Sequence, residues 1–245
     1  MRLVLLLFTG TLLLAQAVFE VAAIRPSNNP TGGFGGGCRG IDSKNTEIPL
    51  GRCVITDARL SHMIGIAWGV SMQKLKTGPD WIQRGDDRFN LEAKAEDPRT
   101  TTEQQLLQML QSLLIERFQL KYHREDVQES GFALTVGKNG PKLKQSTADR
   151  PSFNGGKPIP GRPAAIAVRK VSMSWLAEVI SGVGPGPTVD QTGLTGEYDF
   201  KLDWDDTAGP SLNSALQDQL GLKLVPQKVT RSLFVVDSAQ KPGPN

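Results

Sequence analysis

The sequence predicts an α+β protein made of two tandem copies of a helix-strand-strand-helix-strand-strand unit, with small sheets and helices packed on one face. Two observations lead to this fold class. Apolar residues recur at helical spacing in some segments and at alternate positions in others, in the same order in each half of the 245-residue chain. When one half is laid over the other, four blocks align in that order, at shifts that differ by no more than twelve residues.

The alignment is clearest in the second helix of each predicted copy, where a shift of 102 residues places Leu110 on Leu212 without a gap. The alternating strands before these helices, RFNLEAKA at 88–95 and EYDFKLDW at 197–204, align at a shift of 109. The first helices align at a shift of 113. Each match pairs ordinary apolar residues, so the common order of the blocks is the evidence for a duplication.

The predicted organisation along the chain has five parts. They are a signal peptide at 1–17, an N-terminal strand and Gly-rich loop at 18–57, a first α+β repeat at 58–143, a Pro/Gly-rich linker at 144–165 and a second α+β repeat at 166–245. In the first repeat FQLKYHRE and GFALTVGK are expected to pair as a hairpin. In the second repeat LKLVPQ and RSLFVVDSA are expected to form two separate strands.

The N-terminus has the features of a secretory signal peptide. Met1-Arg2 is positively charged, Leu3–Leu14 is largely apolar, and Ala15–Ala17 supplies a small-x-small cleavage site. The apolar stretch is short for a membrane span, and an uncleaved anchor is the alternative. We therefore expect an exported protein, periplasmic or secreted, with no transmembrane segment after cleavage.

The composition argues against a nucleic-acid partner. The formal net charge is +3 and the pI is about 8.9, but lysines and arginines are scattered among acidic residues and form no basic stripe. We therefore expect no binding to nucleic acid.

The two cysteines, Cys38 and Cys53, lie fifteen positions apart. An exported chain folds in an oxidising compartment, where an even pair at this spacing favours a disulfide. Closing a loop of this size stabilises a fold by roughly 3 kcal/mol in the chain-entropy model. Two free thiols or a two-ligand metal site are the alternatives, and no histidine lies nearby in the sequence to complete a metal site.

The stretch PTVDQTGLTGEYDFKLDW is strongly patterned, and we interpret it as structural. Gly193 and Gly196 suit a turn that needs positive φ, and the side chains of Asp190 and Thr192 are suited to bonding the backbone inside that turn. The following strand alternates, so Asp199 is expected to point to the solvent side.

The sequence offers no catalytic constellation, and we predict no catalytic, cofactor-binding or metal-binding residue. His62 in a helix and His123 at a strand end are interpreted as surface or helix-side residues, because no nucleophile motif accompanies them. Asp203, Asp205 and Asp206 are interpreted as a solvated acidic turn rather than a calcium site. A sugar site is the alternative to a core or domain-interface role for four tryptophans: Trp68, Trp81, Trp175 and Trp204.

The chain resembles a family of exported soil-bacterial proteins, the soil-associated protein family, which is a domain of unknown function. The segments that carry the resemblance are FEVAAIRPS, GPDWI with DRFNLEAKA, TEQQLLQMLQSLLIERFQLKYHRE, GKNGPKLK, VDQTGLTGEYDFKLDW, and ALQDQLGLKLVPQK followed by FVVDSAQKP. Related domains joined to BlaR-like metallopeptidase sensors imply a sensory or binding role, although this chain has no H-E-x-x-H. The order of elements also looks like the short N-terminal domains of secretins and TonB-dependent receptors, which are protein-interaction modules of the envelope.

These observations favour a non-enzymatic envelope module that binds a protein or another ligand, because small open sheets leave edges that accept a partner strand. The alternative is a hydrolase or carbohydrate-active enzyme that uses acidic residues such as Asp80, Asp86, Asp87 or Asp199. A structural module that assembles by self-association is a third hypothesis.

Overall fold

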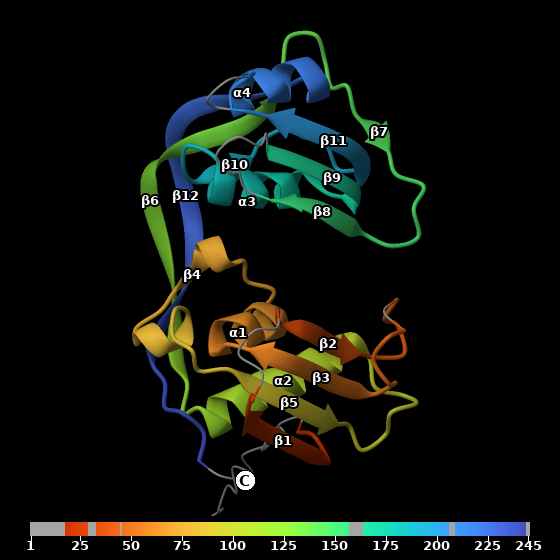
Figure 1. The fold of residues 1–245 in the computed structure, drawn as a ribbon, viewed down its shortest axis with the longest axis vertical. Helices are drawn as coiled ribbons and strands as arrows, with labels where there is room; N and C mark the ends of the chain where they lie inside the picture. The colour runs from red at the N-terminus through yellow and green to blue at the C-terminus, as the bar shows by residue number, and fades with distance from the viewer. Residues whose placement is uncertain (1–17, 29–32, 45, 157–163, 206–208, 244–245) are drawn as a thin grey trace, which may run out of the picture. The chain divides into compact units, whose positions relative to one another are not determined.

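The computed structural model describes residues 18–28, 33–44, 46–156, 164–205 and 209–243. The predicted signal peptide at 1–17 lies outside these residues. The described chain is a mixture of helices and small sheets, which confirms the α+β class. It forms two compact units (Figure 1). Unit 1 takes its described residues from 1–69, 80–120 and 239–245, and unit 2 takes its own from 70–79 and 121–238.

Unit 1 contains one antiparallel four-stranded sheet, in the order β1-β5-β3-β2. Its strands are β1 (Val21–Pro26), β2 (Gly35–Arg39), β3 (Arg52–Ala58) and β5 (Phe89–Lys94). Its helices are α1 (Leu60–Trp68), the 3-10 turn η2 (Asp80–Ile82) and α2 (Glu103–Arg117). The alternation of apolar residues predicted for this strand matches the structure, because Phe89, Leu91 and Ala93 of β5 are all buried. The α2 positions Leu106, Leu110 and Leu114 are buried as well.

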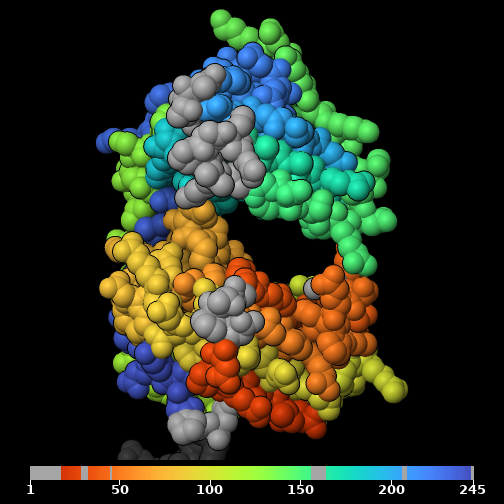
Figure 2. All heavy atoms as spheres, viewed as in Figure 1, coloured from red at the N-terminus to blue at the C-terminus, as the bar shows by residue number. Residues whose placement is uncertain are grey.

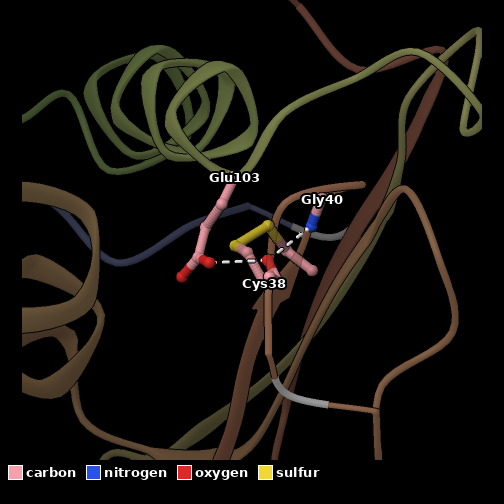
Figure 3. The surroundings of a disulfide bond; sticks show 5 residues. Cys38, Gly40 and Glu103 are labelled. Atoms are coloured by element: carbon pink, nitrogen blue, oxygen red, sulfur yellow. Dashed lines mark hydrogen bonds between the residues drawn. A yellow bond between two sulfur atoms is a disulfide. The ribbon is translucent and has the colours of Figure 1, made fainter.

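The cysteines form a disulfide within unit 1, which confirms that prediction (Figure 3). Cys38 of β2 lies directly opposite Cys53 of β3, with Cα atoms 4.0 Å apart. The loop that follows β2 is tied to the start of α2, since Ser43 Oγ donates to Glu103 Oε2 at 2.5 Å and accepts from Gly40 N at 2.8 Å. The disulfide and this polar contact fix the irregular loop from both sides.

Unit 2 contains two four-stranded sheets, in the orders β7-β11-β9-β8 and β10-β6-β12-β4. The first comprises β7 (Lys144–Gln145), β8 (Ser152–Gly156), β9 (Ala164–Val171) and β11 (Tyr198–Trp204). The second comprises β4 (Leu75–Lys76), β6 (Lys121–Val136), β10 (Thr188–Asp190) and β12 (Leu222–Ser238). The helical elements are η1 (Met72–Lys74), α3 (Met173–Val183), α4 (Leu212–Ala215) and a π-turn, η3 (Leu216–Leu220).

The predicted hairpin in the first repeat is wrong. The segment from Lys121 to Val136 is one continuous strand, β6, and it pairs antiparallel with β12 from Leu222 to Ser238. The two strands predicted in the second repeat are likewise one strand. The residues between the predicted strands, DVQES and KVT, contain no Gly, Pro or Asn to form a tight turn. Each segment therefore continues as a strand and finds its partner about a hundred residues away.

The predicted linker at 144–165 lies inside unit 2 rather than between the units. Its described residues form β7, β8 and the start of β9. Glycine and proline weaken central strands but are accommodated at sheet edges, and β7 and β8 are both edge strands. The Pro/Gly-rich composition therefore predicted a loop, whereas the structure has the two edge strands of a sheet in this segment.

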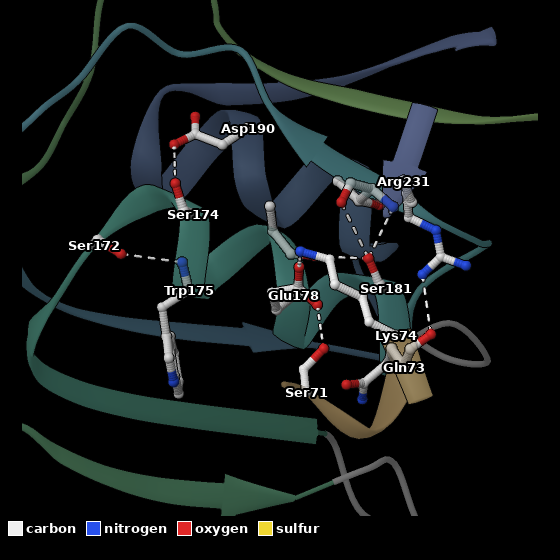
Figure 4. Close-up of polar contacts among 12 residues, drawn as sticks. Ser71, Gln73, Lys74, Ser172, Ser174, Trp175, Glu178, Ser181, Asp190 and Arg231 are labelled. Atoms are coloured by element: carbon white, nitrogen blue, oxygen red, sulfur yellow. Dashed lines mark hydrogen bonds and ion pairs between the residues drawn. The ribbon is translucent and has the colours of Figure 1, made fainter. Parts of the chain in front are cut away.

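Residues 70–79 join unit 2 through a set of polar contacts with α3 and β12 (Figure 4). Glu178 of α3 forms an ion pair with Lys74 and accepts a hydrogen bond from Ser71 Oγ at 2.6 Å. Arg231 of β12 donates to the carbonyl oxygen of Gln73 at 3.1 Å. These contacts hold η1 and β4 in unit 2, although the chain on both sides of them belongs to unit 1.

The turn before β11 uses its polar residues as predicted. Asp190 Oδ1 accepts from Thr192 N at 2.9 Å, and Thr192 Oγ1 accepts from Leu194 N at 3.2 Å. Gly193 has a φ of 70°, but Gly196 is not among the positive-φ residues, so the expectation for Gly196 is wrong. A Cβ at Gly196 would lie 2.9 Å from Tyr198 Oη, so close packing accounts for this glycine.

None of the helices in the described ranges has the length and apolar character needed to cross a membrane.

Candidate functional site

In both units, the bend between a strand and the helix that follows it contains a residue with positive φ. The backbone N–H of this residue donates a hydrogen bond to a side chain of the neighbouring strand. In unit 1 Asp57 adopts a left-handed φ of 50°, and its N–H donates to Asn90 Oδ1 of β5 at 2.9 Å. In unit 2 Lys170 adopts a φ of 54°, and its N–H donates to Asp199 Oδ1 of β11 at 2.9 Å. Both residues lie two positions before the N-cap of the helix that follows, Arg59 or Ser172. The carboxylate of Asp199 therefore stabilises the backbone bend that precedes α3 in unit 2.

Asp199 also gives unit 2 a testable response to acid. The hydrogen bond from Ser146, followed by that from Lys170 N–H, lowers the pKa of Asp199 from its usual 3.8. A carboxyl with a lowered folded pKa stabilises the fold above its unfolded pKa, and this contribution is lost as pH falls through the folded pKa. We expect Asp199→Asn to reduce the fall in melting temperature between about pH 6 and about pH 2.5.

The matched control for this prediction is Asn90→Asp, which places a carboxyl at the corresponding position of unit 1. Asparagine in place of Asp199 keeps an oxygen acceptor for Lys170 N–H, as Asn90 does for Asp57. Thermal unfolding followed by circular dichroism at several pH values measures both variants. Equal acid sensitivity of Asp199→Asn and the unmodified protein would contradict the assignment.

Unit 1 differs from unit 2 in carrying a buried carboxylate at this junction. Asp57 is 5% exposed, and neither of its carboxylate oxygens makes a hydrogen bond with any described residue. Arg88 Nη1 donates to the carbonyl oxygen of Asp57 at 3.0 Å and lies 3.6 Å from its Oδ2. In unit 2 the same position is a lysine whose Nζ contacts Asp149 O at 3.2 Å. The bend in unit 2 therefore forms without a buried carboxylate.

His62 lies beside this ion pair, at the third position of α1. Its Nδ1 accepts a hydrogen bond from Arg59 N at 3.3 Å, so a neutral imidazole carries its proton on Nε2. The ring stacks on Phe34, with centroids 4.0 Å apart and planes at 16°. Burial lowers the pKa of His62, the charges of Arg59 and Arg88 lower it further, and Asp57 opposes them. The imidazole is therefore neutral near neutral pH, and its Nδ1 is occupied by the backbone.

Five residues thus form one group in unit 1, which we call the Arg59–Arg88 cluster: Phe34, Asp57, Arg59, His62 and Arg88. Arg59 Nε donates to the carbonyl oxygen of Gly85 at 2.8 Å. Within the described residues, the terminal amino groups of Arg59 make no hydrogen bond, and the guanidinium of Arg88 makes only the one to Asp57 O. The cluster therefore holds several N–H donors that remain available near a half-exposed aromatic ring.

Unit 2 has an aromatic pair at the corresponding edge. Phe153 of β8 is 52% exposed and packs edge-on against Trp175 of α3, with ring centroids 5.5 Å apart. Trp175 is the third residue of α3, as His62 is of α1, and Ser172 Oγ caps its N–H at 3.1 Å. The indole points away from the helix axis in Figure 4, and the green segment that includes β8 is at the surface in Figure 2. We call Phe153, Trp175 and strand β8 the β8 edge.

The four acidic residues considered as catalytic groups of a hydrolase do not all belong to one unit. Asp80 begins η2, Asp86 is exposed, and Asp87 pairs with Lys241 Nζ at 2.8 Å, all in unit 1. Asp199 belongs to unit 2, where it holds the bend before α3.

The other candidates have local partners. His123 Nδ1 lies 2.9 Å from Asp237 Oδ1, and both side chains are about half exposed. Asp203 pairs with Lys201 at 3.0 Å, and Asp206 lies outside the described residues. Over the described ranges, no group of three or more His, Cys, Asp or Glu residues is arranged to hold a metal ion.

The tryptophans divide between core and surface. Trp204 is 1% exposed, and Trp81 stacks on Phe118 with centroids 6.3 Å apart. Trp175 instead lies half-buried at a sheet edge beside Phe153. Phe153, Asp57 and Arg88 were not among the candidate residues predicted from the sequence. An isolated phenylalanine within the polar, Gly-rich stretch at 144–165 is the signal that would have indicated an exposed aromatic side chain.

The fold defines a mixed α+β protein of two units that alternate along the chain, each with an aromatic side chain at one sheet edge. A family of proteins of unknown function, DUF3738, matches residues 61–239, and the chain belongs to this family. Searches of the curated proteins and of the solved structures find no match to the chain.

Proposed function

We propose that the protein is an exported, non-enzymatic interaction module that binds an extended segment of an envelope protein by strand addition at the β8 edge. The observation that carries this proposal is the position of Phe153, half exposed on the terminal strand of a sheet. Residues 152–155 are all exposed, and β8 pairs with β9 on one side only within the described residues. A terminal strand presents unpaired backbone groups that a partner strand completes.

The side chains at this edge give the added strand an apolar contact. Phe153 lies opposite Val168 of β9, so it belongs to the face of the sheet on which Val168 is buried. A residue of the added strand opposite Phe153 would extend this face by one strand. Trp175 lies next to Phe153 and would cover it. Aromatic residues with a half-exposed apolar surface are typical anchors of protein interfaces.

Export is part of this proposal, and the disulfide between Cys38 and Cys53 supports it, because disulfides persist in oxidising compartments. We also propose that the chain belongs with the exported soil-associated proteins, and that its units serve as interaction modules like the short N-terminal domains of secretins.

A duplication is also proposed, in a modified form. The sheets β1-β5-β3-β2 and β7-β11-β9-β8 share one strand order relative to the helices that follow. Asp57 and Lys170, both with positive φ, are 113 residues apart, which is the shift that aligns the first helices. Gln119 and Gly221, also with positive φ, are 102 residues apart, which is the shift of the second helices. These coincidences support two copies of a strand-helix-strand-helix-strand unit, each ending in one long strand.

The test is affinity capture from an envelope extract of the source organism with matched variants of the chain from residue 18 onward. We expect Phe153→Ala and Trp175→Ala to reduce recovery of the captured partner by about tenfold, as loss of an aromatic anchor does. The matched control is Ile115→Ala, which removes an exposed apolar side chain (37%) from α2 of unit 1, outside both sheet edges. Equal recovery by all variants, or recovery of the bait alone, would contradict the proposal.

A further inference from the structure

We propose that the Arg59–Arg88 cluster of unit 1 binds the terminal carboxylate of an extended peptide that pairs with strand β2. The principle of strand addition is shared with the proposed function, but the strand, the unit and the side chains are different. The β2 site therefore stands or fails independently of the β8 edge.

The charges of the cluster suit a carboxylate. Guanidinium groups bind carboxylates through paired N–H donors, and the unused donors of Arg59 and Arg88 lie close enough to His62 to shift its titration. The neutral imidazole contributes a further donor at Nε2. Arg59 is the N-cap of α1 and His62 is its third residue, at the end where the helix dipole favours a negative group.

Asp57 acts in this proposal as a positioning residue. Its carboxylate is nine-tenths buried and has no hydrogen bond, while Arg88 lies against it with a side chain that is 16% exposed. A buried carboxylate without hydrogen-bond donors destabilises a fold, and such groups are characteristic of functional sites. The ion pair fixes Arg88 in one position, and its 3.6 Å separation leaves donors of the guanidinium for a ligand.

Strand β2 supplies a backbone edge next to these groups. It is the terminal strand of its sheet and contains Gly35, Gly36 and Gly37. Gly36 has a φ of 97°, and a Cβ there would overlap the carbonyl oxygen of Val54. The absence of side chains at Gly35, Gly36 and Gly37 gives a peptide backbone close access to this half of the strand. Phe34, immediately before β2, is 47% exposed and offers an apolar contact for the last side chain of the peptide.

This arrangement selects a peptide with a free carboxylate over other partners. An internal segment of a chain has no terminal carboxylate, and it supplies a negative group at Arg59 and Arg88 only where an Asp or Glu side chain falls at that position. A cationic group would be repelled by the two guanidinium groups. The proposed ligand class is therefore the carboxyl terminus of a protein or peptide, held by β2, Phe34 and the two arginines.

The test compares two pools of acetylated tetrapeptides that are identical except at the last group. One pool ends in a free carboxylate and the other in a carboxamide, and both are randomised at the last two residues. Each pool is passed over immobilised protein, and the bound peptides are quantified by mass spectrometry. We expect at least about tenfold higher retention of the acid pool, because only it makes the charge-assisted hydrogen bonds.

Variants separate this site from the β8 edge. Arg59→Gln removes one guanidinium from a partly exposed position, and we expect it to abolish the preference for the acid pool. Phe34→Ala is expected to weaken retention of both pools. Phe153→Ala is the control and is expected to leave the acid preference unchanged, whatever it does to capture of an envelope partner. Equal retention of the two pools by the unmodified protein would overturn the proposal.

Titration of His62 by NMR gives a second readout that a purely structural role would not move. Carboxylate binding near His62 is expected to raise its pKa, since a nearby anion favours the imidazolium form. Adding the acid pool should produce this shift, and the amide pool should not. Asp57→Asn leaves Arg88 without its ionic partner and is expected to reduce the shift. An acid pool that leaves His62 unchanged would also overturn the proposal.

Discussion

Replacing Cys38 and Cys53 with serine is expected to lower the free energy of unfolding by about 3 kcal/mol, the largest effect that we expect from changes at the unit 1 sheet edge. The bond closes a loop with a sequence separation of 15 and joins residues directly opposite each other in β2 and β3. In the chain-entropy model, removing it gives freedom back to the unfolded chain and leaves the β-pairing of the folded state in place. Urea denaturation followed by tryptophan fluorescence measures the change.

A reductant provides the control for this prediction. Treating the unmodified protein with dithiothreitol should reproduce most of the loss seen in the double serine variant. The double variant itself should not respond to the reductant, because it has no other cysteines. An unmodified protein that keeps its unfolding midpoint after complete reduction would contradict the stabilising role.

Trp204→Ala is expected to destabilise unit 2 by about 3–5 kcal/mol, as truncation of a buried tryptophan generally does. Trp204 ends the alternating strand β11 and is 1% exposed. It belongs to a core cluster with Leu202 of the same strand and Leu216 of the following helical segment. Replacement by alanine leaves a cavity among side chains from several elements, and these can close it only in part.

Trp204→Phe is the matched variant, and it should cost much less than the alanine substitution. The indole Nε1 of Trp204 is buried and has no hydrogen-bond partner among the described residues. Phenylalanine retains most of the apolar ring and removes a donor that is unsatisfied, which offsets part of the lost volume. Unfolding curves in urea rank the three proteins. A phenylalanine variant as unstable as the alanine variant would show that the indole N–H has a partner.

The helices and short strands could be predicted from the sequence because their patterns are local. The spacing of Leu106, Leu110 and Leu114 identified the buried face of α2, and the alternation of Phe89 and Leu91 identified β5. Pairing between distant segments was not visible in the same way. The residues that join β6 to β12 lie about a hundred positions apart, and a local hairpin satisfied the same apolar pattern.

The candidate sites were harder to predict than the fold because burial of a polar group depends on tertiary packing. Asp57 and Arg88 are ordinary charged residues in the sequence, and only the fold places them against each other. His62 was interpreted from its helical position alone, without Phe34 or the two arginines that surround it. The cysteines were the exception, because an even pair fifteen positions apart in a chain expected to be exported already favoured a disulfide.

The path of the chain between the two units has a consequence for limited proteolysis. The chain passes from one unit to the other after residues 69, 79, 120 and 238. Gln240 N donates to Phe118 O at 2.7 Å, so the last described residues complete unit 1, which the first residues began. No single proteolytic cut therefore separates the two units, because each is built from segments that alternate along the chain with those of the other.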